Sequence, residues 1–122
     1  MLYDLRIPKI NPHMSGALIE CIYAVSGTPM RAGDKILDLS IDLGQAFAQE
    51  CPPISYYRLV LRENLWLRRL EVTAGVSWDT ARPLAIFSSD PDEPTDATPG
   101  RTVRSAVAGI VYHTGMWSGN AP

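Results

Sequence analysis

Apolar and polar residues alternate along most of the first 88 residues of the chain. In the stretch KILDLSI, Leu37, Leu39 and Ile41 alternate with polar residues, which is the period of a strand with one buried face. Further stretches rich in β-branched and aromatic residues predict strands at residues 3–7, 17–25, 55–61, 65–72 and 83–87. A short return strand is expected at residues 46–50, because the two prolines that follow cannot continue a strand ladder. Up to residue 88, no window keeps apolar residues at the spacing of a helix face, so the pattern predicts an all-β fold.

Glycine and proline residues indicate the turns between these strands. Gly27 and Gly33, with a proline between them, predict a turn before the KILDLSI strand. A second long turn is expected at residues 73–83, and a short one at residues 62–64.

The two long turns belong to an internal repeat. Gly75 lies 48 residues after Gly27, and at this offset the flanking strands and turns align. The aligned apolar pairs are Ile22 with Leu70, Met30 with Trp78, Ile36 with Leu84, and Leu39 with Phe87. Because one copy is too small to bury its own apolar face, we expect two pseudo-twofold-related copies that close into a flattened β-barrel.

Length and charge limit the classes of function. A chain of 122 residues with a formal net charge of −2 is one domain with tails, and its acidity argues against nucleic acid or an anionic membrane as a partner. It contains no apolar run of the roughly 18–20 residues that span a bilayer, and its first residues do not resemble a signal peptide. A cytoplasmic location is therefore the expectation.

The cysteines and histidines do not form a metal-binding pattern. Cys21 and Cys51 are far apart, and we expect two free, buried thiols, with a disulfide or a reactive thiol as the alternatives. His13 and His113 lie near opposite ends of the chain. A joint zinc site would need both ends to meet and two further ligands, so no metal is predicted.

Catalytic motifs are also missing from the sequence. It has no nucleophile elbow, no phosphate-binding glycine loop and no His-Glu-x-x-His motif, so we do not expect an enzyme. Asp34, Asp38 and Asp42 recur at four-residue spacing on one predicted strand face. We interpret them as a solvated acidic face rather than as a cation site.

Several motifs in the correct order resemble the lipoyl domains of 2-oxoacid dehydrogenase acyltransferases and, more distantly, biotinyl carrier domains. They are IPKI at residues 7–10, GALIE at residues 16–20, the turn with Gly27, Met30, Gly33, Asp34 and Ile36, and the returning segments LEVTAGVSW and RPLAIF. The resemblance covers roughly residues 3–88. It implies a lipoyl/biotinyl-like domain at residues 1–88 with the barrel-sandwich hybrid fold, a flattened β-barrel of two related halves.

The cofactor-bearing lysine of this family has no equivalent here. In lipoyl domains the tip of the hairpin reads Asp-Lys-Ala, and the lysine carries the cofactor through an amide. The corresponding residues are Asp42, Leu43 and Gly44, so Leu43 occupies the attachment position. The only lysines are Lys9 and Lys35. We therefore predict no covalently bound cofactor. The alternative is lipoate or biotin attached at a displaced site, for which Lys35 is the fallback.

The segment at about residues 54–64 is longer than its family equivalent. It predicts either an extra hairpin inserted beside the barrel or a lengthening of the strands that flank the tip. Tyrosine, tryptophan and arginine, which anchor many protein interfaces, concentrate in and after it. The predicted interaction surface consists of Asp42, Leu43, Gly44, Tyr56, Tyr57, Arg58, Arg62, Trp66 and Arg68. The simpler alternative is that the aromatic residues complete the core and the arginines form a solvated strand face.

The C-terminal part of the chain has a different composition. Residues 89–100 are acidic and rich in proline, which predicts a flexible linker. Residues 101–122 are expected to form a tail, in which a short docking segment and a disordered end are the alternatives.

Together these features predict a non-catalytic scaffold or protein-interaction module with a lipoyl-like fold. Its expected partner is another protein, for example a subunit of a multienzyme complex. The alternative is a lipoyl or biotinyl carrier domain of an acyltransferase-like complex with a displaced attachment site.

Overall fold

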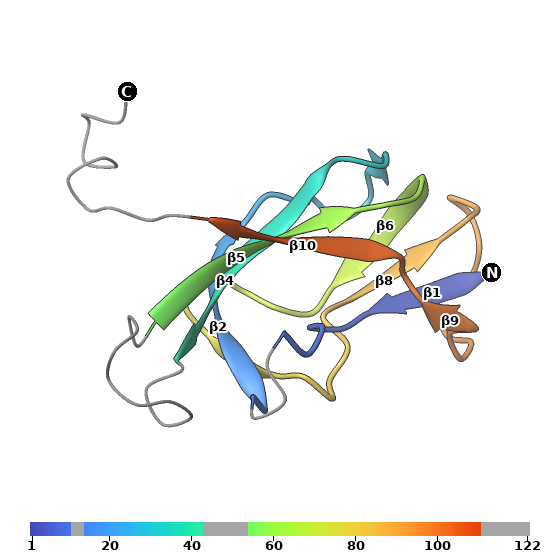
Figure 1. Cartoon of the computed structure of the whole chain (residues 1–122). Helices are drawn as coiled ribbons and strands as arrows, with labels where there is room; N and C mark the ends of the chain where they lie inside the picture. The colour runs from blue at the N-terminus through green and yellow to red at the C-terminus, as the bar shows by residue number, and fades with distance from the viewer. Residues whose placement is uncertain (11–13, 43–53, 111–122) are drawn as a thin grey trace.

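The computed structural model describes residues 1–10, 14–42 and 54–110 (Figure 1), and within them it contains only β-strands and loops. The strands are β1 (Leu2–Leu5), β2 (Gly16–Ile22), β3 (Pro29–Met30), β4 (Lys35–Asp42), β5 (Ile54–Leu61), β6 (Leu65–Leu70), β7 (Ser77–Asp79), β8 (Ala85–Ser88), β9 (Arg101–Thr102) and β10 (Ser105–Ile110). The predicted all-β class is confirmed for these residues. The strand expected at residues 46–50 lies outside them.

The strands form two five-stranded sheets. The first sheet has the order β3-β6-β8-β1-β9, and the second has the order β10-β5-β4-β2-β7. Alternate side chains of both sheets form one core, in which Leu39, Leu59, Leu67 and Phe87 are fully buried. The described strands form no closed barrel, since the two sheets are separate. Within the described residues, no helix has the length and apolar character needed to cross a membrane.

Hydrogen bonds between the two halves follow the 48-residue offset of the internal repeat. The Gly27 N–H donates to the Leu67 carbonyl at 2.7 Å, and the Gly75 N–H donates to the Ile19 carbonyl at 2.7 Å. Gly75 lies 48 residues after Gly27, and Leu67 lies 48 residues after Ile19. Exchanging the two halves therefore converts one bond into the other.

Irregular features repeat at the same offset. The register of β2 on β4 shifts between Ile19 and Cys21, and that of β6 on β8 shifts between Leu67 and Arg69. Gly27 and Gly75 have positive φ values of 85° and 86°, which glycine adopts without strain. The short strands β3 and β7 form inside the two predicted turns, and each pairs with the other half of the molecule.

The long segment at residues 54–64 does not form a separate hairpin. Residues 54–61 are β5, which pairs with β4 from Lys35 opposite Val60 to Asp42 opposite Ile54. This arrangement agrees with the second alternative given by the sequence, in which the strands that flank the tip are lengthened. β5 also pairs with β10 on its other side and thus lies inside the second sheet.

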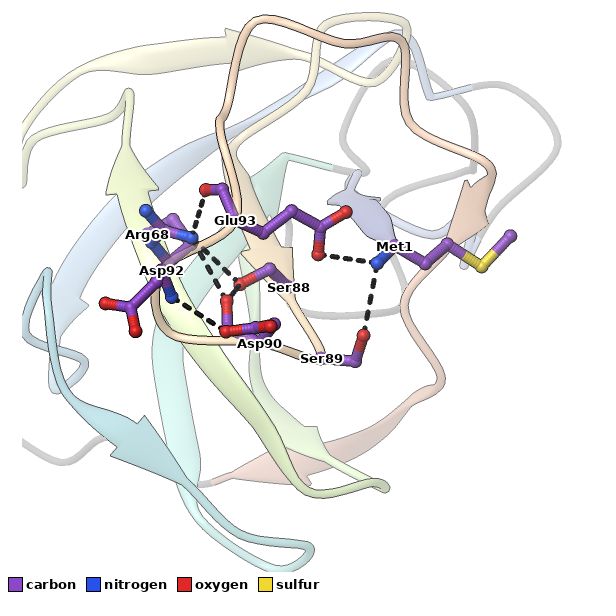
Figure 2. Close-up of polar contacts among 7 residues, drawn as sticks. All are labelled: Met1, Arg68, Ser88, Ser89, Asp90, Asp92 and Glu93. Carbon is purple, nitrogen blue, oxygen red and sulfur yellow. Dashed lines mark hydrogen bonds and ion pairs between the residues drawn. The ribbon is translucent and has the colours of Figure 1, made fainter.

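The two sheets continue beyond residue 88, where the sequence places the end of the β domain. Figure 2 shows how the segment after β8 is held against the first sheet: Arg68 Nη1 donates to Ser88 Oγ at 3.2 Å and to the carbonyls of Asp90 and Glu93 at 3.2 and 2.6 Å. β9 then pairs in parallel with β1, and β10 pairs antiparallel with β5. Residues 101–110 therefore run from the first sheet to the second.

An ion pair between Arg101 and Glu63, here called the clasp, stabilises the point where the chain crosses from the first sheet to the second. Arg101 donates to both carboxylate oxygens of Glu63 at 2.8 and 2.7 Å, and the Arg104 backbone N–H donates to Glu63 at 2.7 Å. The Arg101 guanidinium also lies 4.3 Å from the ring centre of Tyr3. The hydrogen bond from Arg101 is the main reason why the pKa of Glu63 is lowered to about 2.

The clasp predicts acid-sensitive stability. The folded pKa of Glu63, about 2, lies below its ordinary value of 4.5, so its contribution is present above pH 4.5 and is lost as the pH falls toward 2. At neutral pH we expect Glu63→Gln to lower the free energy of unfolding by on the order of 2 kcal/mol. Urea unfolding of both proteins should show this difference at about pH 7 and little of it near pH 2.5.

Glu71→Gln is the matched control, because Glu71 forms an ion pair with Arg69 in which both side chains are more than 40% exposed. Its effect should stay within about 1 kcal/mol. A Glu63→Gln effect that is independent of pH would contradict the assignment.

The repeat predicts that substitution of its two turn glycines lowers the free energy of unfolding by similar amounts. Gly27→Ala and Gly75→Ala should each lower the free energy of unfolding by about 1–2 kcal/mol, because a Cβ is strained at positive φ. Neither added Cβ would meet an atom within 4 Å, so the cost is conformational strain alone. Gly109→Ala, in a strand and equally free of clashes, should not be destabilising. Chemical denaturation of the three variants checks this.

Candidate functional site

A polar cluster centred on Asp38 lies on the outer face of the second sheet. Asp38 stands between Leu37 and Leu39, whose side chains are in the core, so its own side chain points to the opposite face. It nevertheless has an exposed fraction of 0%. Its neighbours across the sheet are Cys21 on β2 and Arg58 on β5.

Arg58 neutralises the buried carboxylate. Its Nε donates to Asp38 Oδ1 at 2.7 Å, and its Nη2 donates to Asp38 Oδ2 at 3.1 Å. Such bidentate pairs are stronger and more directional than pairs joined by a single hydrogen bond. The hydrogen bond to Asp38 raises the pKa of Arg58 above its ordinary value, and the side chain remains 28% exposed.

Tyr23 covers the ion pair from the segment that follows β2. Its hydroxyl donates to Asp38 Oδ2 at 2.6 Å and accepts from Arg58 Nη2 at 3.1 Å. Burial, followed by the hydrogen bond and charge of Asp38, raises the pKa of Tyr23 to about 12. The raised pKa reflects burial and the hydrogen bond that the protonated hydroxyl donates to Asp38.

Cations flank the Tyr23 ring. Lys35 Nζ lies 4.5 Å from the ring centre, and the Arg58 guanidinium carbon lies 5.3 Å from it. These are cation–π distances. Nearer the end of β4, Ser40 Oγ donates to Glu20 at 2.6 Å. Alternating charges thus follow the outer face of β2, β4 and β5 toward residues 43–53, which connect β4 to β5.

The polar groups of this cluster are hydrogen-bonded to one another. Every buried side-chain polar atom of the described residues has a hydrogen-bond partner. In the same part of the chain, no three potential metal ligands gather in one place. Tyr23 and Arg58 remain partly exposed, and tyrosine and arginine are residue types that anchor many protein interfaces.

The structure separates the predicted interaction residues. Tyr56 and Arg58 lie on the outer face of β5, whereas Tyr57 points inward and packs against the core. Arg62 is exposed just after β5. Trp66 and Arg68 belong to the first sheet, where Arg68 holds the segment after β8. Only part of the predicted surface is therefore contiguous.

The predicted tip can be described only in part. Asp42 is the last residue of β4 and pairs with Ile54 through the backbone. Leu43 and Gly44 lie outside the described residues, as do Cys51, His13 and His113. The remaining cysteine, Cys21, is a free thiol but only half-buried, not buried as expected.

Sequence reasoning missed Tyr23 and misplaced Asp38. The expectation that Asp38 belongs to a solvated acidic face is wrong, because its side chain is fully buried and hydrogen-bonded to Arg58 and Tyr23. Asp34 lies before β4, where it accepts from the Arg31 backbone N–H. The missing signal was the strand register, which alone brings Arg58 opposite Asp38.

Comparisons with protein-family models, with curated proteins and with solved structures found no match for this chain.

The Asp38–Arg58 pair predicts that removing one partner destabilises the protein much more than replacing both partners. Arg58→Met should lower the free energy of unfolding by about 3–5 kcal/mol, because it leaves Asp38 buried without its cation. The double variant Arg58→Met/Asp38→Leu should recover much of this loss. Arg69→Met, which breaks an exposed pair on the other sheet, should cost no more than about 1 kcal/mol. Equal costs for the two arginine variants in denaturant titrations would contradict the structural role of the pair.

Proposed function

We propose that this protein is a non-catalytic protein-interaction module with a lipoyl-like fold and no covalently bound cofactor. The observation that carries the proposal is the 48-residue repeat, in which each half completes the other half's sheet. Such an exchange is compatible with the barrel-sandwich architecture that the family resemblance implies. Of the motifs behind the resemblance, the turn that begins at Gly27 contains β3 and leads into β4.

The lysines support a scaffold over a carrier. A cofactor-bearing lysine must present its amine at the tip of the hairpin. Here β4 and β5 pair up to Asp42, and the connection between them contains Leu43 and no lysine. Lys35 lies at the opposite end of β4, where its amine contacts the Tyr23 ring.

The proposed binding surface is the outer face of β2, β4 and β5 together with the adjoining connection. Tyr23 and Arg58 are positioned by the buried Asp38, so little conformational entropy is lost when a partner covers them. The mixed charges of the face suit a protein partner better than a polyanion. A subunit of a multienzyme complex remains the proposed class of partner, and the cytoplasm the proposed location.

The experiment is a ligase assay read by intact mass. Wild type, Leu43→Lys and Val76→Lys are co-expressed with lipoate and biotin ligases, beside a lipoyl domain that becomes fully loaded. We expect an unmodified wild type, a modified Leu43→Lys variant and an unmodified Val76→Lys variant. Val76 is a suitable control because it is 41% exposed next to the repeat-related turn glycine Gly75.

The other outcomes are equally informative. A loaded wild type, with the modification mapped to Lys35, would replace the scaffold by a carrier domain with a displaced site. An unmodified Leu43→Lys variant would show that the β4–β5 connection is not equivalent to the lipoyl hairpin, and would remove the basis of the proposal.

A further inference from the structure

The outer edge of β10 is the least protected strand edge in the described structure. β10 is terminal in the second sheet and pairs only with β5 there (Figure 1). It consists of six residues, SAVAGI, with neither charge nor proline. Natural sheets usually block exposed edges with short strands, charges or prolines, because a bare edge recruits other strands.

The other three terminal strands carry such protection. β3 has two residues and includes Pro29, and β9 also has two residues. β7 has three residues and ends in Asp79. Within the described residues, β10 is thus the one terminal strand that lacks such protection.

The backbone groups on this edge can be assigned from the register. Ser105 lies opposite Leu61, whose N–H and C=O bond to Asp34 and Gly33 on the other side of β5. The next pair does bond across the strands, since the Arg62 N–H donates to the Arg104 carbonyl at 2.9 Å. Bonded and non-bonded pairs alternate in an antiparallel ladder. The N–H and C=O groups of Ser105, Val107 and Gly109 therefore point away from β5.

This outward set is self-complementary. It is symmetric about Val107, so a second β10 strand running antiparallel would place Val107 opposite Val107 and Ser105 opposite Gly109. Three pairs with two bonds each give about six main-chain hydrogen bonds. We propose that β10 pairs with β10 of a second copy of this chain, which joins the two second sheets into one continuous sheet across a twofold axis.

The side chains of β10 are compatible with pairing to β10 of a second copy. Val107 is 36% exposed and would pack against its own copy at the axis. Ala106 would face Ala108 of the second copy, where neither residue is large enough to clash. Arg104 would face Ile110 of the second copy, so the two arginine charges lie at opposite ends of the pair. The contact is isologous, and it closes at two copies.

The test is the oligomeric state of the full chain. Because only one strand pair is buried, we expect a weak, concentration-dependent dimer in sedimentation velocity between about 10 µM and about 1 mM. Val107→Pro removes an outward N–H that β5 does not use, and Val107→Lys places two like charges at the axis. Both variants should be monomeric throughout, whereas Val25→Lys, at a valine 61% exposed elsewhere, should dimerise like wild type.

Amide hydrogen exchange supplies a second readout. Exchange at Ser105, Val107 and Gly109 should slow as the protein concentration rises. Exchange at Ala106, Ala108 and Ile110 should be slow at every concentration. A wild type that stays monomeric, or a dimer that persists in both Val107 variants, would overturn the proposal. Neither result depends on the state of Leu43, so the ligase assay and this test fail independently.

Discussion

Neither half of this protein can complete its sheet without the other half. The reciprocal bonds from Gly27 to Leu67 and from Gly75 to Ile19 fix that exchange, because they place the short strand after each glycine beside the long strand of the opposite half. The rest follows from this constraint. The core can form only when both sheets face each other, and β4 and β5 lie side by side only when the second sheet is assembled.

Two ion pairs then determine which further groups the assembled sheets hold in place. Glu63 and Arg101 hold the crossing from the first sheet to the second, which allows β10 to extend the second sheet beyond the repeat. Asp38 and Arg58 neutralise each other on the outer face of that sheet and hold Tyr23 over it. A buried ion pair contributes little net stability, but it enforces one arrangement of its partners, since an unpaired member is costly.

These features lead to two proposals that concern different parts of the second sheet. Its face and the β4–β5 connection are proposed to bind another protein, and its β10 edge is proposed to bind a second copy. The two surfaces do not compete, because pairing at the edge leaves the Tyr23–Arg58 face exposed. A dimer would present that face twice, which would raise the apparent affinity for a partner with repeated sites.

The sequence by itself determined the strand class, the turn positions and the 48-residue repeat, because alternation, glycine and proline act within a few residues of one another. It also showed that no lysine occupies the expected tip. Only the tertiary structure decided that Asp38 is buried, that Tyr57 belongs to the core, and that residues 101–110 enter both sheets. Each of these depends on which strand lies opposite which, and that register is set by long-range packing and hydrogen bonds that no local pattern records.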